Sequence, residues 1–398
     1  MAPLTTFEKR IKRHIIGREQ DFFIVTAPGL EQLCYDELLQ LPLSCKKAAV
    51  VEGGIEFTGR LHDCYLANLH LRMANRILMR VARFKSSNFQ RLGNKIFVIP
   101  WELYLHRDNT LTVHVTSRHS RLYHKGAVAD CCREKIAQRL AAYAPETRSE
   151  AAAITCQQIF VRIVDDQCTL SLDSSGELLH KRGLKSHRAA APLRETIAAA
   201  ILKIAGFTEN GPLIDPMCGS GTFSLEAAML VKRIPAGWFR DFAFMGWPVF
   251  LPKRWHYIRR QSESLFAEQH EPPIFAFDRD AAVCDELEQC VDRYHLTDAV
   301  QVLCQDFFKL EPAGFTSSTG LVVLNPPYGM RIGKTREALN LFTALCRKLQ
   351  QSYGGWQLAL LVPGASFRDK IPFPGLTEQR LFHGGLNVVL LTGRIACS

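Results

Sequence analysis

The sequence predicts an α/β protein whose C-terminal half forms a doubly wound, mostly parallel sheet. Short apolar runs, typical of buried strands, alternate there with helical segments. The runs are LID (213–215), IFAFD (274–278), VQVLCQD (300–306), LVVLNPP (321–327) and WQLALLVP (356–363). Two further strands, RLFH and LNVVLLTGRI, are separated by Gly384-Gly385, so we expect them to close the sheet as an antiparallel hairpin.

The composition suits a globular protein with a polyanionic partner. The chain has 398 residues, 47% hydrophobic and 22% charged, which is enough for two or three domains with buried cores. Its formal net charge is +10. Because basic side chains that neutralise phosphates release counterions, this charge favours a nucleic acid as partner, although a merely basic surface has the same composition.

The cysteines and histidines indicate neither disulfides nor a metal site. Thirteen cysteines are scattered without a C-x-x-C pair. His114, His119 and His124 have no thiolate or carboxylate at ligand spacing, so no metal is expected. The sequence shows neither an export signal nor a run of about 20 apolar residues. We therefore expect a cytoplasmic protein without a membrane anchor.

The N-terminal half is expected to begin with a small α/β unit. It starts with a strand at FFIVTA (22–27), followed by a helix over Leu30–Leu41 and a second strand over Gly53–Phe57. From Cys64 to Phe84 the apolar residues recur at helical spacing, which predicts a helix. Four arginines fall on or near another face of that helix: Arg72, Arg76, Arg80 and Arg83.

Strands and one long helix are expected next, with basic loops between them. The strand candidates are IFVIP (96–100), LTVHVTS (111–117), IFVRIVD (159–165) and CTLSLDS (168–174), and the helix covers Lys125–Tyr143. Basic groups for phosphates and an aromatic ring for stacking suit RNA, although a polar loop before a helix has a similar composition. The candidate RNA contacts are Arg118, Arg121, Tyr123 and Lys125 in the loop 117–126, and Lys181, Arg182, Lys185 and Arg188 in the hinge 176–192.

A glycine-rich turn between a strand and a helix predicts a cofactor site at residues 213–230. Glycines let backbone N–H groups approach a ligand closely, and the helix that follows presents more of them. A P-loop would need a lysine after the glycines, and a dinucleotide loop would need a third glycine where Ser224 stands. The arrangement that remains holds the amino-acid end of S-adenosylmethionine (SAM) at Asp215 and the glycine turn, with Asp278 at the ribose hydroxyls.

Four motifs in order, DPMCGSGT, FDRD, QDFF and NPPYG, resemble class I SAM-dependent methyltransferases that act on amino groups. More narrowly, residues 179–202 together with DPMCGSGT and NPPYG resemble the THUMP-domain RNA methyltransferases of the RlmL type, which modify guanine N2 in large-subunit (23S) ribosomal RNA. The resemblance extends from about Phe22 to the C-terminus. It implies the following organisation: a basic arm (1–20), a ferredoxin-like part (21–63), a THUMP RNA-binding domain (64–174), a linker (175–192), and a Rossmann-like methyltransferase domain with a mostly parallel seven-stranded sheet (193–398).

The same resemblance implies the roles of individual residues. The cofactor is expected to contact Arg194, Glu195, Asp215, Pro216, Cys218, Gly219, Gly221, Thr222, Asp278, Asp306, Phe307 and Asn325. Asp306 would take the adenine amino group and Phe307 the adenine face. The catalytic motif would be Asn325, Pro326, Pro327 and Tyr328, in which the Asn325 side-chain oxygen and the Pro326 carbonyl hold the target amino group and Tyr328 stacks on the base.

The expected reaction is methylation of guanine N2 in ribosomal RNA, with transfer RNA as the alternative substrate. DNA adenine-N6 methylation also fits NPPY, but the THUMP-like N-terminal half argues against it. A non-enzymatic RNA-binding protein is disfavoured by the intact Gly219, Gly221, Asp278 and Asn325. Some members of the family carry a second methyltransferase domain, and we expect that second activity to be absent here.

A tryptophan-rich segment, residues 232–273, is too long for a simple connection between a strand and a helix. It contains Trp238, Trp247 and Trp255 together with several arginines and prolines. We expect it either to clamp RNA or to pack as a lid.

Overall fold

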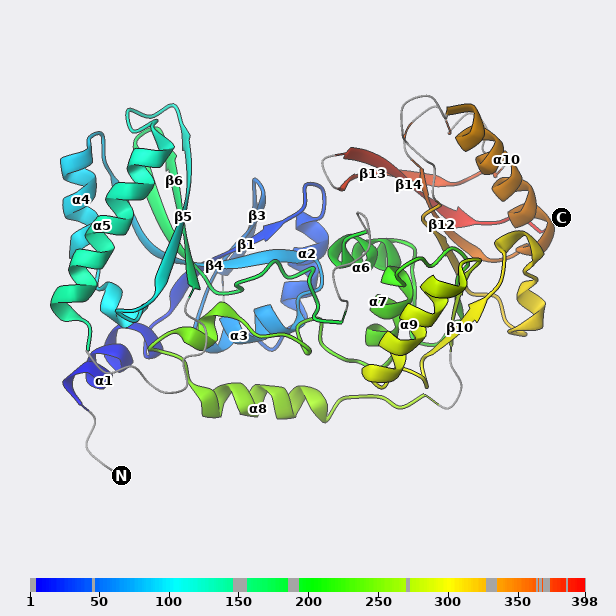
Figure 1. Ribbon diagram of the computed structural model, residues 1–398, viewed down its shortest axis with the longest axis horizontal. Coiled ribbons are helices and arrows are strands. Elements are labelled where there is room, and N and C mark those ends of the chain that lie inside the picture. Colours follow the sequence, from blue (N-terminus) through cyan, green and yellow to red (C-terminus); the bar gives the residue numbers. More distant parts are fainter. Residues whose placement is uncertain are drawn as a thin grey trace. The chain divides into compact units, whose positions relative to one another are not determined.

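The computed structural model describes residues 5–44, 47–145, 156–184, 193–269, 273–326, 335–362, 364, 367, 373–383 and 386–397. This part of the chain forms two compact units (Figure 1). The first unit contains residues 5–27, 31–179 and 239–261, and the second contains residues 28–30, 180–238 and the chain from 262 onward. No helix among the described residues combines the length and apolar character needed to cross a bilayer.

The first unit is built on one seven-stranded sheet with the order β2-β3-β1-β4-β7-β6-β5. Only the β5–β6 pair is parallel. The pairing of β1 with β4 joins the expected ferredoxin-like part (21–63) to the expected THUMP part (64–174) in a single sheet. The strands are β1 (Gln20–Thr26), β2 (Lys47–Val51), β3 (Gly54–Gly59), β4 (Ala74–Lys85), β5 (Thr110–Arg118), β6 (Cys156–Val164) and β7 (Gln167–Asp173).

Helices cover one face of this sheet, whose side chains form the core of the unit. A row of buried residues runs in register across six strands: Phe57, Phe22, Met79, Leu172, Ile159 and Val113. The α-helices are α1 (Thr6–Ile11), α2 (Glu31–Leu39), α3 (Leu61–His70), α4 (Phe89–Val98), α5 (Lys125–Tyr143) and α8 (Pro252–Glu263), with the shorter helices η1 (Lys12–Ile16), η2 (Trp101–Leu103) and η3 (Ala243–Gly246). Helix α5 packs on β5 and lies beside α4 (Figure 1).

Two predictions of secondary structure in this unit are wrong. The expected helix 64–84 is divided: α3 ends at His70, and β4 begins at Ala74. Pairing with β1 on one side and β7 on the other overrides the apparent helical spacing. The run IFVIP (96–100) is not a strand, because its first three residues end α4. The expected strands at 22–27, 53–57, 111–117, 159–165 and 168–174 and the helices at 30–41 and 125–143 are confirmed.

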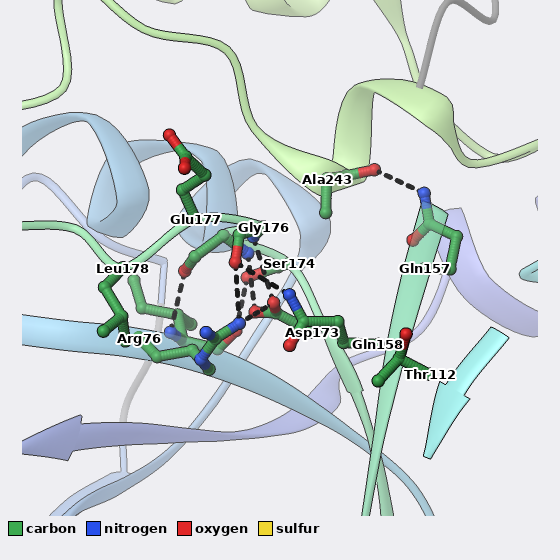
Figure 2. Close-up of polar contacts among 12 residues, drawn as sticks. Arg76, Thr112, Gln157, Gln158, Asp173, Ser174, Gly176, Glu177, Leu178 and Ala243 are labelled. Carbon is green, nitrogen blue, oxygen red and sulfur yellow. Dashed lines mark hydrogen bonds and ion pairs between the residues drawn. The ribbon is translucent and has the colours of Figure 1, made fainter. Parts of the chain in front are cut away.

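The chain leaving β7 is fastened to the sheet by side-chain hydrogen bonds (Figure 2). Arg76 forms an ion pair with Asp173 and donates a hydrogen bond to the Gly176 carbonyl at 2.8 Å. The Ser174 hydroxyl donates to the Ile77 carbonyl at 2.7 Å. Burial and the Arg76 charge act on Asp173 in opposite directions; burial dominates and raises the pKa of its carboxyl to about 6. Residues 173–178 are therefore an ordered part of the first unit.

Residues 239–261 of the tryptophan-rich segment are part of the core of the first unit. Tyr65 on α3 stacks on Phe244 with ring centroids 4.5 Å apart, and the edge of Trp255 meets Tyr65 at 6.2 Å. The buried Trp247 indole donates a hydrogen bond to the Gln157 side-chain oxygen at 3.0 Å. These rings are therefore not available to clamp RNA. Because residues 239–261 pack in the first unit, the expected methyltransferase boundary of 193–398 does not hold for them.

The second unit is a Rossmann-like sheet with the order β10-β9-β8-β11-β12-β14-β13. All its strand pairs are parallel except those of β14 with β12 and β13. The strands are β8 (Leu213–Asp215), β9 (Ile274–Asp278), β10 (Val300–Cys304), β11 (Leu321–Leu324), β12 (Gln357–Val362), β13 (Thr377–His383) and β14 (Leu386–Arg394). The helices are α6 (Glu195–Ile204), α7 (Thr222–Val231), α9 (Ala281–Arg293), η4 (Phe307–Lys309), η5 (Pro312–Gly314) and α10 (Thr335–Ser352). The predicted fold class and the closing β13–β14 pair are confirmed.

Candidate cofactor and methyl-transfer site

The strand order of the second unit brings the predicted site residues to one edge of its sheet. From β8 the chain passes first to β9 and β10 on one side, and then returns to β11 on the other side of β8. Ligands of open α/β sheets bind at the carboxyl ends of the strands where the order reverses in this way. Asp215 and Asp278 end β8 and β9, Asp306 follows β10 by two residues, and Asn325 follows β11 directly.

The glycine turn after β8 leaves space beside its backbone. Gly219 and Gly221 have φ angles of +52° and +69°, which favour glycine. A Cβ at Gly221 would lie 2.3 Å from Leu287, so this position must also be small for packing. A Cβ at Gly219 would meet no atom within 4 Å. Since packing does not explain Gly219, the turn suits a ligand that approaches the backbone there.

Asp278 links the end of β9 to this turn. The Gly219 N–H donates to one carboxylate oxygen at 3.0 Å, and the Asp280 N–H donates to the other at 3.1 Å. A carboxylate has about four acceptor positions, so two remain for the hydroxyl groups of a ribose. The residues present therefore fit the role predicted for Asp278.

Asp215 is arranged differently from the expectation. It is only 1% exposed, and one of its oxygens accepts a hydrogen bond from the Ser224 hydroxyl at 2.8 Å. Its carboxylate thus ties the end of β8 to the first turn of α7 and offers little surface to a ligand. Ser224 is the residue that sequence reasoning missed, because it was considered only as a missing glycine. The spacing from Asp215 to the first turn of the helix was the available signal.

Cys218, Pro216 and Thr222 form the walls of the turn. Pro216, Cys218 and the Thr222 side chain are buried. Burial, together with the negative charges of Asp215 and Asp278, raises the pKa of the Cys218 thiol well above its usual range. The thiol therefore stays protonated, and Cys218 serves packing rather than nucleophilic chemistry.

The predicted adenine contacts differ from each other. The half-buried Asp306 accepts a hydrogen bond from the Phe308 N–H at 2.8 Å at the start of η4. Phe307 lies in the hydrophobic core, with its ring centroid 6.1 Å from that of Tyr353. Its ring has little free surface, whereas Phe308 is 41% exposed. The prediction that Phe307 presents its ring to adenine is therefore wrong in this structure.

The remaining site residues are partly described. Arg194 is exposed and Glu195 half-buried at the start of α6, a helix that packs against α7. Asn325 is exposed and Pro326 buried. Pro327 and Tyr328 lie outside the described residues, so their predicted roles remain predictions.

The predicted RNA contacts of the loop 117–126 are accessible. Arg118, Arg121 and Lys125 are exposed, and Tyr123 is 65% exposed with its ring 4.2 Å from that of His124. The loop is held by Asp166, which accepts a hydrogen bond from the Arg121 N–H at 2.8 Å.

Arg182 does not fit its predicted role as an RNA contact. It is 2% exposed and donates a hydrogen bond to the buried Glu226 of α7 at 2.7 Å. A guanidinium buried against a carboxylate cannot reach a phosphate. Lys181 is half-buried, and Lys185 and Arg188 lie outside the described residues.

The second unit's fold and its edge of acids around a glycine turn define a Rossmann-like methyltransferase. The comparisons with known proteins agree: residues 182–388 match the family described as the RMKL-like methyltransferase domain, and residues 21–78 match the RlmL ferredoxin-like domain. The chain belongs to the RMKL-like methyltransferase family.

Two curated relatives and one solved structure illustrate this membership. The chain is 32% identical to the ribosomal RNA large subunit methyltransferase K/L of Syntrophotalea carbinolica, over 94% of the chain and 53% of that relative. It is 30% identical to the putative RNA methyltransferase slr0064 of Synechocystis sp., over 93% of the chain and 95% of that relative. The crystal structure of SMU.472, a putative methyltransferase complexed with S-adenosylhomocysteine (SAH), superposes with a TM-score of 0.83 at 26% identity, over 96% of the chain and 99% of SMU.472. The chain spans about half the length of the K/L relatives it matches.

Proposed function

We propose that the chain transfers a methyl group from SAM to the N2 amino group of a guanine in large-subunit ribosomal RNA. The observation that carries the proposal is the edge formed by β8, β9 and β11, where Asp278 anchors the glycine turn and an exposed Asn325 directly follows β11, the strand next to β8. The K/L relatives named as ribosomal RNA large subunit methyltransferases, and the relative crystallised with SAH, support the substrate and the cofactor.

In this proposal the chain's own residues position the two reactants. The glycine turn and Asp278 bind SAM, which supplies a methyl group activated by its sulfonium. The target amino group is a weak nucleophile because its lone pair is delocalised into the guanine ring. The Asn325 side-chain oxygen and the Pro326 carbonyl accept hydrogen bonds from this amino group, which favours a more tetrahedral nitrogen with its lone pair directed at the methyl carbon. Positioning of this kind contributes much of the rate enhancement and needs no strong general base.

Replacement of Asn325 tests this role directly. We expect Asn325→Ala to lower kcat for methyl transfer by a factor of about 10² to 10⁴, the range for loss of a positioned group in proton-coupled chemistry. SAH affinity, measured by calorimetry, should stay within about twofold of the wild-type value, because the turn and Asp278 remain. Asn325→Asp keeps an acceptor oxygen and serves as the matched variant, with activity above that of Asn325→Ala. Loss of SAH binding in Asn325→Ala would place Asn325 in the cofactor site instead.

The substrate is tested by labelled methyl transfer from SAM to total RNA and DNA from a strain that lacks the gene. Nucleoside mass spectrometry then identifies the product. N2-methylguanosine in 23S ribosomal RNA is the expected result. The same nucleoside in transfer RNA would contradict the substrate but keep the mechanism, and N6-methyladenine in DNA would contradict both the substrate and the use of the first unit.

A further inference from the structure

The face of the first unit's sheet opposite the helices carries polar, basic and aromatic side chains. Along β5, Thr112, His114, Thr116 and Arg118 are exposed on this face. On β6 it carries the half-buried Phe160 and the exposed Arg162. In register across four strands lie Arg80, Ser171, Phe160 and His114. None of these residues is among the predicted cofactor contacts, and of them only Arg118 belongs to the loop 117–126.

A β-bulge concentrates arginines on this face. Arg80 pairs with Ser171 and Arg83 with Thr169, and the register shifts between residues 80 and 82. In a regular strand two residues three positions apart point to opposite faces, so the bulge is what puts Arg80 and Arg83 on the same one. Thr169 also pairs with Arg162 on β6. Arg83 and Arg162 therefore flank Thr169 from its two neighbouring strands.

These arginines are unequally neutralised. Arg80 forms an ion pair with Glu56 at 3.2 Å, and its guanidinium lies 4.5 Å from the centre of the Phe23 ring. Arg83 and Arg162 are exposed and form no ion pair with any residue that the structure describes. Partial burial, and beyond it repulsion by Arg162 and Arg83, lower the pKa of the Arg80 guanidinium. Like charges held this close repel each other in the free protein, and an anion bound between them relieves that repulsion.

The arginines line a trough on the sheet surface with a volume of about 1170 Å³. Its basic side chains are Lys47, Arg80, Arg83, Lys85 and Arg162, against the carboxylates of Asp21, Glu56 and Asp165. Asp21 accepts a hydrogen bond from the Thr58 hydroxyl at 2.9 Å, and Glu56 is occupied by Arg80. Five basic side chains against three carboxylates leave an excess of positive charge, and Arg83 and Lys85 on β4 and Arg162 on β6 contribute to it.

An aromatic stack adjoins the trough. Phe160 lies two residues before Arg162 on the same face of β6, and the rings of Phe160 and His114 stack with centroids 4.7 Å apart. The guanidinium of Arg76 lies 5.2 Å from the centre of the Phe160 ring. His114 is exposed, and its ring is oriented by a 3.0 Å hydrogen bond between Nε2 and the Gln158 side-chain oxygen. The stack thus ends in an ordered, exposed aromatic ring.

We propose that this open sheet face binds a single-stranded segment of the RNA substrate, with Arg83 and Arg162 at successive phosphates and the His114 ring under a base. The inference rests on the proposed function, because it assigns a binding surface to the same substrate. A sheet that presents aromatic rings between basic groups suits unpaired nucleotides, whose bases are free to stack, whereas duplex RNA is recognised by its shape and its minor groove. The proposal moves the main RNA contact from the loop 117–126 to the strands beside it.

The test is fluorescence anisotropy with a labelled, unstructured 12-nucleotide RNA and the full chain. We expect Arg83→Ala/Arg162→Ala to bind at least about tenfold more weakly, and the slope of log affinity against log salt to fall by about 1.4, for two phosphate contacts at about 0.7 each. His114→Ala should weaken binding about tenfold without changing that slope, because base stacking is not electrostatic. The matched control is Arg91→Ala/Lys95→Ala on α4, which removes two exposed basic side chains outside this face.

Two results would overturn the proposal. One is an affinity and a salt slope for Arg83→Ala/Arg162→Ala equal to those of the α4 control. The other is wild-type binding of a 12-base-pair RNA duplex as tight as that of the single strand. Far-ultraviolet circular dichroism shows that each variant is folded. In methyl-transfer assays, the arginine variant should raise KM for RNA and keep kcat and SAH affinity. A wild-type chain that binds SAH and single-stranded RNA but methylates no RNA would contradict the proposed function and leave the surface standing.

Discussion

Gly219 and Gly221 share a left-handed backbone conformation, yet the structure gives them different tasks. The Gly221 position is filled by Leu287, whereas Gly219 faces open space. The sequence motif alone could not separate the two roles, because Leu287 lies far away in the chain, on α9. A local sequence motif therefore does not show which residues pack against a binding loop.

The pair of glycines therefore makes a matched experiment. Gly219→Ala should lower the free energy of unfolding by about 1–2 kcal/mol, the cost of a left-handed non-glycine residue, and should weaken SAH binding by more than about tenfold. Gly221→Ala should destabilise the fold by more, since a new methyl group must also displace Leu287. Urea denaturation and calorimetry measure both quantities. Equal unfolding free energies for the two variants would contradict this assignment.

His70 at the end of α3 links stability to pH. Burial, and next the charge of Arg72, lower the pKa of its imidazole from 6.5 to about 4. The unfolded chain therefore takes up a proton that the folded chain refuses, so stability is fully present above pH 6.5 and is lost as the pH falls toward 4. A shift of one pKa unit corresponds to about 1.4 kcal/mol of folding free energy. Because the His70 side chain is only partly buried, we expect a smaller loss of stability than this conversion gives, about 2 kcal/mol over this pH window. His70→Gln should remove this part of the pH dependence in urea denaturation, and an unchanged profile would contradict it.

At the scale of elements, most strands and helices follow from local pattern, and β4 shows why some do not. Arg76, Arg80 and Arg83 are four and three residues apart, which is the spacing of a helix face. A bulge gives a strand the same pattern, because it adds one residue between Arg80 and Arg83 without changing the face. Only the pairing with β1 and β7 decides between a helix and a strand, and the paired residues are 48 to 57 positions away on β1 and 82 to 95 positions away on β7.

The segment that enters the second unit is fastened to α7 by the ion pair of Arg182 and Glu226. Both side chains are almost fully buried. Removing one partner of a buried pair leaves an uncompensated charge, so Glu226→Ala should lower the free energy of unfolding by about 3–5 kcal/mol. The double variant Arg182→Met/Glu226→Leu should recover most of this loss. A double variant as unstable as Glu226→Ala would mean that the pair's other contacts, and not its charges, carry the stability.

On the scale of the whole molecule, the packing of the insert 239–261 into the first unit could not be predicted from the sequence. The sequence indicated that the segment was too long for a simple connection, but its tryptophans suited either RNA or packing. The packing partners of these tryptophans, Tyr65 and Gln157, come from distant parts of the chain. Composition alone therefore could not distinguish RNA binding from core packing. The meeting of Asp215, Asp278 and Asn325 at one edge of the second sheet was predictable, because these residues come from short motifs at strand ends. The burial of Asp215, Arg182 and Phe307 was not predictable from the sequence, because it depends on what packs over these side chains.

Replacement of Trp255 tests whether the insert 239–261 belongs to the core of the first unit. Trp255→Ala should destabilise the first unit by about 3–5 kcal/mol, as for other buried large-to-small changes. Hydrogen exchange should then accelerate in α3 and β4 and stay unchanged in β9 and β11. Trp238→Ala is the matched control, because Trp238 packs on Phe266 within the second unit. Faster exchange in β9 and β11 of Trp255→Ala would contradict the placement.

The insert also constrains how the protein is made. Phe244 and Trp255 are synthesised some 180 to 190 residues after Tyr65, the ring they pack against. At translation rates of about 5–20 residues per second, the nascent first unit waits on the order of 10–40 s for the last part of its core. During that interval the aromatic surface of α3 stays uncovered, and β8 and the glycine turn are translated before the interval ends. The first unit therefore cannot finish folding before the glycine turn of the second unit has been translated, and chaperones have a defined period in which to act.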